Sequence, residues 1–96
     1  MGDDRKARNE QNALRIAEWL LEHEAEFEEP GIREAGIAEA LGLSEADAEA
    51  AIDYLENREE VVRWPEALAT PPIFVLKPAR GWPDIKAKLL ERKGQA

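Results

Sequence analysis

The sequence predicts a mainly α-helical α+β domain in which three helices precede a β-hairpin and a last helix follows it. Two observations support this class. Apolar residues recur at helical spacing over three segments, which are 9–28, 33–57 and 83–93. Two runs rich in β-branched and aromatic residues, 61–64 and 73–77, lie between the last two helical segments. The expected order is therefore α-α-α-β-β-α, and Ile32 is a candidate for a short extra strand.

The first helix is expected over 9–28. Residues 1–8 contain no apolar anchor and are expected to be disordered, so that 9–93 form a single domain. Pro30 ends the helix because proline disfavours a helical conformation in the residue before it. The glutamates near the end of this helix oppose its dipole, so we expect them to be frayed or paired with the basic C-terminal tail.

A helix-turn-helix is expected over 33–57, with the turn at 42–44. Gly42 suits the turn because glycine adopts positive φ angles after a helix without a steric clash. Ser44 can cap the second helix with its hydroxyl group, and Asp47 stands three residues later, as in a capping box.

A β-hairpin is expected over 61–77, with its return strand at 73–77. Asn57 is the candidate left-handed residue that ends the preceding helix. The last helix is expected over 83–93, because Pro83 suits the first helical position and basic residues stand in the last turn.

One pattern of apolar and turn residues covers the helix-turn-helix and the strand after it. It consists of Ala40, Leu41, Gly42, Leu43, Ser44, Ala48, Ile52, Leu55, Val61 and Val62. This pattern resembles the helix-turn-helix of winged-helix transcription regulators, and the resemblance extends over roughly 12–81. It implies a winged-helix fold in which the hairpin 61–77 is the wing. Terminal helices pair across a dimer axis in many such regulators, so the resemblance also implies a homodimer as one candidate assembly.

The second helix of the motif, which would read DNA in such a regulator, is acidic. The chain has a formal net charge of −8, and residues 44–60 contribute seven acidic groups and one basic group. Its face away from the apolar side carries five carboxylates, Glu45, Asp47, Glu49, Asp53 and Glu56. DNA binding depends on cations that neutralise phosphates. We therefore interpret the chain as a non-enzymatic module that acts chiefly through protein contacts, as a dimer or an adaptor. Solubility or salt adaptation would also account for the surface acid.

The alternative is a DNA-binding transcriptional regulator that uses its wing and its basic tail. The candidate DNA contacts are Arg63, Trp64, Lys77 and Arg80. Residues 61–80 and 81–96 each carry a net charge of +2, which is a weak basic patch. DNA gains support if these cations form one continuous surface.

A candidate protein-interaction surface combines apolar residues of the first and last helices. Its members are Trp19, Trp82, Ile85, Leu89 and Leu90. Exposed tryptophan is typical of interfaces, whereas a buried tryptophan is part of the core. The exposure of these residues therefore decides between an interface and ordinary packing.

The sequence offers little for catalysis, metals or cofactors, and we predict none of them. It contains one histidine, His23, and a metal site would need three or four converging ligands. There is no cysteine. No stretch approaches 18 apolar residues, and the charged N-terminus lacks the apolar region of a secretory signal. We therefore expect a cytoplasmic protein that does not contact membranes.

Overall fold

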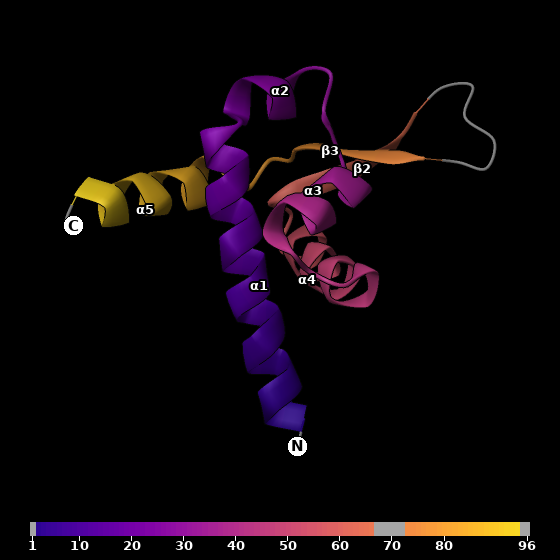
Figure 1. The fold of residues 1–96 in the computed structure, drawn as a ribbon. Helices are drawn as coiled ribbons and strands as arrows, with labels where there is room; N and C mark the ends of the chain where they lie inside the picture. Colours follow the sequence, from indigo (N-terminus) through magenta and orange to yellow (C-terminus); the bar gives the residue numbers. More distant parts are fainter. Residues whose placement is uncertain (1, 67–72, 95–96) are drawn as a thin grey trace.

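The computed structural model describes residues 2–66 and 73–94 of the chain. Within these residues the elements are α1 (Gly2–Glu22), α2 (Glu24–Glu28), β1 (Ile32–Arg33), α3 (Glu34–Leu41), α4 (Glu45–Asn57), β2 (Val61–Pro65), β3 (Phe74–Pro78) and α5 (Trp82–Gly94) (Figure 1). The expected α+β class is confirmed, and the candidate strand at Ile32 is present as β1. Residues 67–72 of the expected wing lie outside the described residues.

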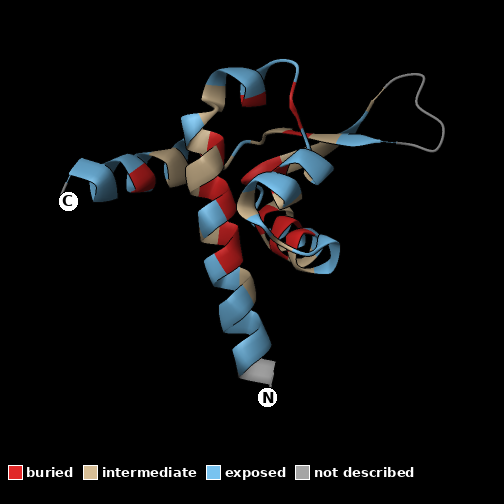
Figure 2. Cartoon of the chain, viewed as in Figure 1, coloured by how far each residue is buried: buried red, intermediate tan, exposed pale blue. Residues whose placement is uncertain are grey.

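Helix α1 begins at Gly2, so residues 2–8 are helical where the sequence predicts disorder. Residues 5–8 are arginine, lysine, alanine and arginine, all of which favour helix. They extend the helix beyond the apolar part that contacts the rest of the chain. Figure 2 shows this end of α1 exposed and projecting away from the core.

The single helix expected over 9–28 is broken at His23, which separates α1 from α2. The backbone N–H of His23 is shared between the carbonyl oxygens of Trp19 and Leu20, both at 3.1 Å. The ring Nδ1 lies 2.8 Å from the same Trp19 oxygen. The ring also stacks on the Trp19 indole, with centroids 4.0 Å apart. The chain turns after this residue, and Phe27 is buried against Trp82. Helical spacing alone does not reveal this contact, because Trp82 is far away in the sequence.

One hydrophobic core joins the helices to the sheet, and many of its buried residues lie where α1 passes α3 and α4 (Figure 2). The largest fully buried side chains are Phe27, Ile16, Leu20, Ile37, Ile52, Leu76 and Val61. Each such side chain contributes about 1.5–3 kcal/mol relative to an exposed position. This core holds α4 against α1 and fixes which face of α4 points outward.

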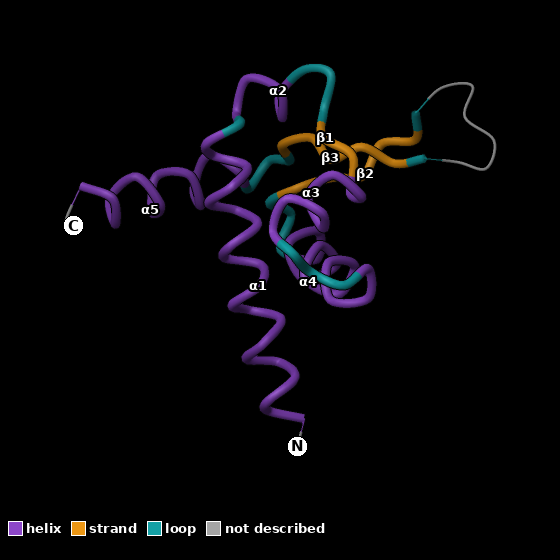
Figure 3. The backbone as a smooth tube through the Cα atoms, in the orientation of Figure 1, coloured by secondary structure: helices purple, strands orange, loops and turns teal. Residues whose placement is uncertain are grey.

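The sheet is antiparallel, with strand order β1-β3-β2 (Figure 3). Arg63 on β2 lies opposite Leu76 on β3, and Trp64 lies opposite Val75. Because side chains alternate between the two faces of a strand, Arg63 and Leu76 share the face toward α3 and α4. Trp64 therefore belongs to the opposite face, which we call the outer face and which lies beside Trp19 and His23.

The turn from α4 into β2 differs from the expected one. Asn57 is still helical, so it is not the left-handed residue; Glu59 is, with φ of 59°. The segment before α5 lies close to this turn, and the N–H of Gly81 donates to the Glu59 carbonyl at 2.7 Å. A Cβ atom on Gly81 would stand 2.7 Å from that oxygen, so the close approach requires glycine.

Candidate interaction surface

The turn 42–44 positions α4 as the sequence predicts. Gly42 has φ of 66°, in the left-handed region. The Ser44 hydroxyl accepts a hydrogen bond from the backbone N–H of Asp47 at 3.1 Å, which confirms the predicted cap. One side of α4 is buried through Ala48, Ala51, Ile52 and Leu55. The acidic side therefore faces outward.

The five carboxylates of this acidic side fall into two groups along α4. Glu45 and Glu49 are exposed near the N-terminal end, and Asp47 between them is half-buried. Asp53 and Glu56, near the C-terminal end, bind Arg63 of β2. The two ends of α4 thus present different chemistry.

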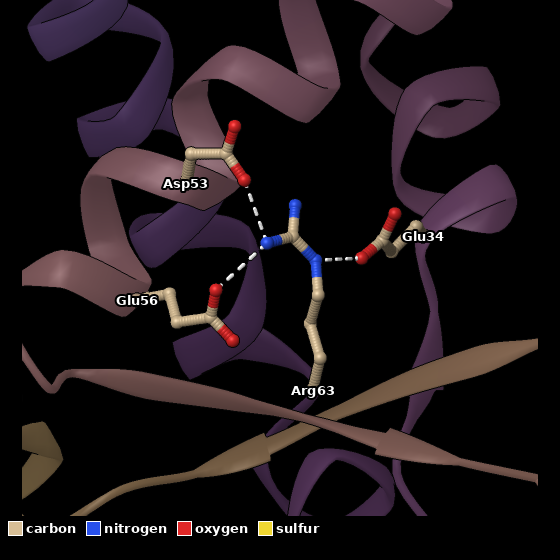
Figure 4. Close-up of polar contacts among 4 residues, drawn as sticks. All are labelled: Glu34, Asp53, Glu56 and Arg63. Carbon is tan, nitrogen blue, oxygen red and sulfur yellow. Dashed lines mark hydrogen bonds and ion pairs between the residues drawn. The ribbon is translucent and has the colours of Figure 1, made fainter.

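Arg63 is held by carboxylates from two helices (Figure 4). Its Nε donates to Oε1 of Glu34 on α3. Its Nη1 donates to Oδ1 of Asp53 at 2.6 Å and to Oε1 of Glu56 at 2.9 Å. The Arg63 side chain is 17% exposed, so solvent screens these contacts less than it screens an ordinary surface pair.

We call Arg63 with Glu34, Asp53 and Glu56 the Arg63 cluster, and its hydrogen bonds favour the charged form of Arg63. Burial alone lowers the pKa of Arg63, but the hydrogen bonds that it donates to Glu34 and Asp53 raise the pKa above its usual value. One cation balances three carboxylates, which leaves a formal charge of −2 when all four groups are ionised. The guanidinium expected to contact DNA is therefore engaged within the fold.

The other candidate DNA contacts do not join Arg63 on one surface. Trp64 is 54% exposed and lies on the outer face of the hairpin. Lys77 pairs in register with Val62, two residues before Trp64, and so shares that outer face. Arg80 lies beyond the end of β3, and its Nε is 3.4 Å from Glu59 Oε2. The structure thus separates the predicted set into at least two regions.

The basic tail on α5 pairs with the acidic end of the first helical region. Lys86 Nζ lies 2.7 Å from Glu24 Oε2, and Lys93 Nζ lies 3.7 Å from Glu22 Oε1. Of the glutamates near the end of the expected helix, Glu24 is thus paired with the tail, one of the two outcomes that the sequence predicts. Hydrogen bonds from Lys86 and, second, from Trp82 lower the pKa of Glu24. Several tail cations that could join a DNA surface are thus already paired.

The predicted apolar interaction surface does not form one exposed patch. Trp82 is buried: its ring meets Phe27 edge-on, with centroids 4.8 Å apart, and its Nε1 donates to Glu24 Oε2 at 3.1 Å. Leu89 is also buried, whereas Trp19 and Ile85 are half-buried. Leu90, which is 50% exposed, is the fully outward member. The prediction fails for Trp82 and Leu89 because α5 packs its first turns against α2 and α1.

Among the surface hollows, none of which was predicted, two lie on opposite faces of the hairpin. One, of about 730 Å³, is lined by Trp19, His23, Trp64 and Lys77 among others. The other, of about 600 Å³, lies between α3, α4 and the start of β3. We call the second hollow the α3/α4 groove. It is lined by Arg33, Glu34, Ala35, Ala38, Glu45, Ala48, Glu49, Ile73 and Phe74.

The described residues contain no group of three or more histidine, cysteine or carboxylate side chains that could hold a metal ion. In the same part of the chain, no helix has the length and hydropathy needed to cross a membrane.

No protein-family model and no curated protein matches the chain. Solved structures do resemble it. A mutant of S. aureus MepR bound to an oligodeoxyribonucleotide aligns with 98% of this chain and 71% of its own, with a TM-score of 0.66 and 13% identity. A second S. aureus MepR mutant aligns with 98% of this chain and 73% of its own, with a TM-score of 0.60 and 14% identity. At this identity the likeness concerns the fold. The chain has the winged-helix fold that these two structures share.

Proposed function

We propose that this winged-helix domain acts through protein contacts, with α4 facing a basic partner instead of the DNA major groove. The observation that carries the proposal is the negative charge of α4, together with the ion pairs that hold Arg63 beside it. Glu45–Asn57 contains five carboxylates and no lysine or arginine. Arg63, the candidate DNA contact that faces α4, is engaged by three carboxylates.

Electrostatics explain why this surface suits a cation better than a duplex. DNA carries one negative charge per about 1.7 Å of helix axis, and proteins bind it by neutralising phosphates with lysine and arginine. Recognition helices read bases mostly through arginine, lysine, asparagine and glutamine. Exposed Glu45 and Glu49 would meet phosphates with like charge. The same residues attract a basic protein surface and favour its approach.

A second candidate function is DNA binding by a regulator, through the wing and the basic ends of the chain. Two observations favour it. One MepR mutant with this fold is bound to an oligodeoxyribonucleotide. In addition, the exposed part of α1 carries Arg5, Lys6 and Arg8, and Lys77 lies on the outer face of the hairpin. Arg5 and Arg8 line a hollow beside Ala46, Asp47 and Ala50 at the N-terminal end of α4, whereas Lys77 lies on the hairpin face opposite Arg63. DNA bound by these cations would therefore adopt a different geometry from DNA bound by a recognition helix.

The two functions are separated by fluorescence anisotropy with a labelled random duplex, at low and at moderate salt. We expect no binding by the wild-type chain. The double variant Glu45→Lys/Glu49→Lys should gain salt-sensitive binding, because it removes like charge from α4 and adds two cations. The matched control, Glu28→Lys/Glu29→Lys, makes the same change of net charge on and just after α2, away from α4.

A wild-type chain that binds duplex at low salt, with affinity falling steeply as salt rises, would refute the protein-contact function. Equal gains in duplex affinity by the two double variants would show that the net charge of the chain, and not the position of the charge on α4, opposes DNA binding. Light scattering with size-exclusion chromatography tests whether the partner is a second copy. The helices available for such a pairing are α1 and α5, which project from the body in Figure 1, and Leu90 is exposed on α5.

A further inference from the structure

The α3/α4 groove combines a floor of small residues with a wall of large exposed apolar ones. Ala35 and Ala38 of α3 and the buried Ala48 of α4 line it. Phe74, the first residue of β3, is 42% exposed, and Ile73 just before it is 39% exposed. Large apolar side chains that stand together in a hollow are typical of a binding surface.

Acidic side chains stand at the α4 side of this groove. Glu45 and Glu49 are four residues apart, so they lie on one face of α4, about one turn from each other. Both are exposed, and neither has an ion-pair partner among the described residues. Arg33, the cation that lines the groove, pairs with Glu66 at 3.0 Å. The free charge beside the apolar wall is therefore negative.

We propose that the α3/α4 groove binds an amphipathic, basic segment of a partner protein. This proposal rests on the proposed function and names the chemistry of the partner. The apolar face of the segment would lie against Ile73, Phe74 and the alanine floor. Its lysine or arginine side chains would reach Glu45 and Glu49. The charge complementarity selects a basic segment, and the alanine floor leaves room for its large apolar side chains. Helices recognised in grooves place such anchors three and four residues apart.

The probe is a fluorescein-labelled synthetic helix of about four turns, or about 14 residues, with leucines on one face and lysines elsewhere. A scrambled peptide of the same composition, with its leucines spread around the helix, is the control for charge alone. Anisotropy titrations compare both peptides with the wild-type chain and three variants. Phe74→Ser removes part of the wall. Ala35→Lys fills the floor and adds a cation, and Trp64→Ser removes an exposed aromatic from the opposite face of the hairpin.

We expect the amphipathic peptide to bind more tightly than the scrambled one. Phe74→Ser and Ala35→Lys should each weaken binding about tenfold, and Trp64→Ser should change it less than about twofold. Thermal melting checks each variant. If Phe74→Ser is unfolded, Ala35→Lys decides, because Ala35 is exposed and its replacement removes no core atom.

Four results would overturn the groove proposal. Equal affinity for the two peptides would show ionic attraction alone, and no binding of either would show that the groove does not take this chemistry. Unchanged binding by Phe74→Ser and Ala35→Lys would place the peptide elsewhere. Self-association that Phe74→Ser abolishes would make a second copy the occupant and would also overturn the basic-partner proposal. The duplex titration is independent of all these outcomes, so failure of the groove and failure of the protein-contact function are distinguishable.

Discussion

Replacing Arg63 with methionine should destabilise the fold by about 2 kcal/mol. Removing one member of a buried ion pair costs about 3–5 kcal/mol, whereas exposed pairs contribute about 0–1 kcal/mol. The Arg63 cluster lies between these limits, because the Arg63 side chain is 17% exposed and its three partners are 29–53% exposed. Methionine keeps the aliphatic part of the side chain and removes the charge. The three carboxylates then repel one another without a cation between them.

The assay is urea denaturation followed by circular dichroism, with the free energy of unfolding extrapolated to water. The matched control is Arg33→Met, because the Arg33–Glu66 pair is exposed; we expect a loss below about 1 kcal/mol. A second test uses the sign of Asp53→Asn. This change should destabilise the wild-type chain but stabilise Arg63→Met, where it removes one of three like charges. A loss below about 0.5 kcal/mol for Arg63→Met, or the same sign in both backgrounds, would refute the role of the cluster.

The remaining predictions concern one titrating group and two glycines. The pKa of Glu24 is lowered in the folded chain, mainly by its hydrogen bond with Lys86. This contact should therefore stabilise the fold at pH values above 4.5, the usual pKa of the group, and the stabilisation should be lost as the pH falls further and protonates the folded chain. The melting temperature of Glu24→Gln should therefore lie below wild type at neutral pH and approach it in acid; a gap independent of pH would contradict this. Gly81→Ala should destabilise by more than about 1 kcal/mol, because its Cβ atom would stand 2.7 Å from a backbone oxygen. Gly36→Ala, in open space within α3, should stabilise by about 0.5–1 kcal/mol. Urea denaturation measures the free energy of unfolding of both glycine variants. An equal change in the two variants would show that the close approach at Gly81 is unimportant.

The helix-turn-helix is the part that sequence predicts best, because its boundaries depend on local chemistry. Gly42 ends α3 through its own φ angle, and Ser44 caps α4 with its own side chain. Neither interaction needs a residue far away in the chain. The end of α4 shows the limit of this reasoning: Asn57 is the better left-handed residue by preference, yet Glu59 adopts that conformation. The contact from the segment before α5 accompanies it, and that contact joins residues too distant for local patterns to reveal.

The candidate site was predicted less well, because its residues gain their roles from distant partners. Arg63 is basic and stands in the wing, which suggests DNA by composition alone. Its actual environment depends on Glu34, which is 29 residues earlier in the chain. Trp82 similarly reads as an interface residue until Phe27 and Glu24 are seen to surround it. Side chains alternate along β3, so Phe74 lies on the same side as Leu76, and this alternation is the signal by which sequence could have found part of the groove wall.

The two ends of α4 explain why its acidity has more than one cause. If all five carboxylates served solubility, none of them would need a partner inside the fold. Asp53 and Glu56 instead hold β2 against α4 through Arg63, so their charge stabilises the winged-helix structure. Glu45 and Glu49 are exposed beside the α3/α4 groove and take no part in that cluster. Charge reversal at the C-terminal end of α4 would therefore perturb folding and binding together. Reversal at Glu45 and Glu49 leaves the cluster intact, and a change in affinity there reports on the surface itself.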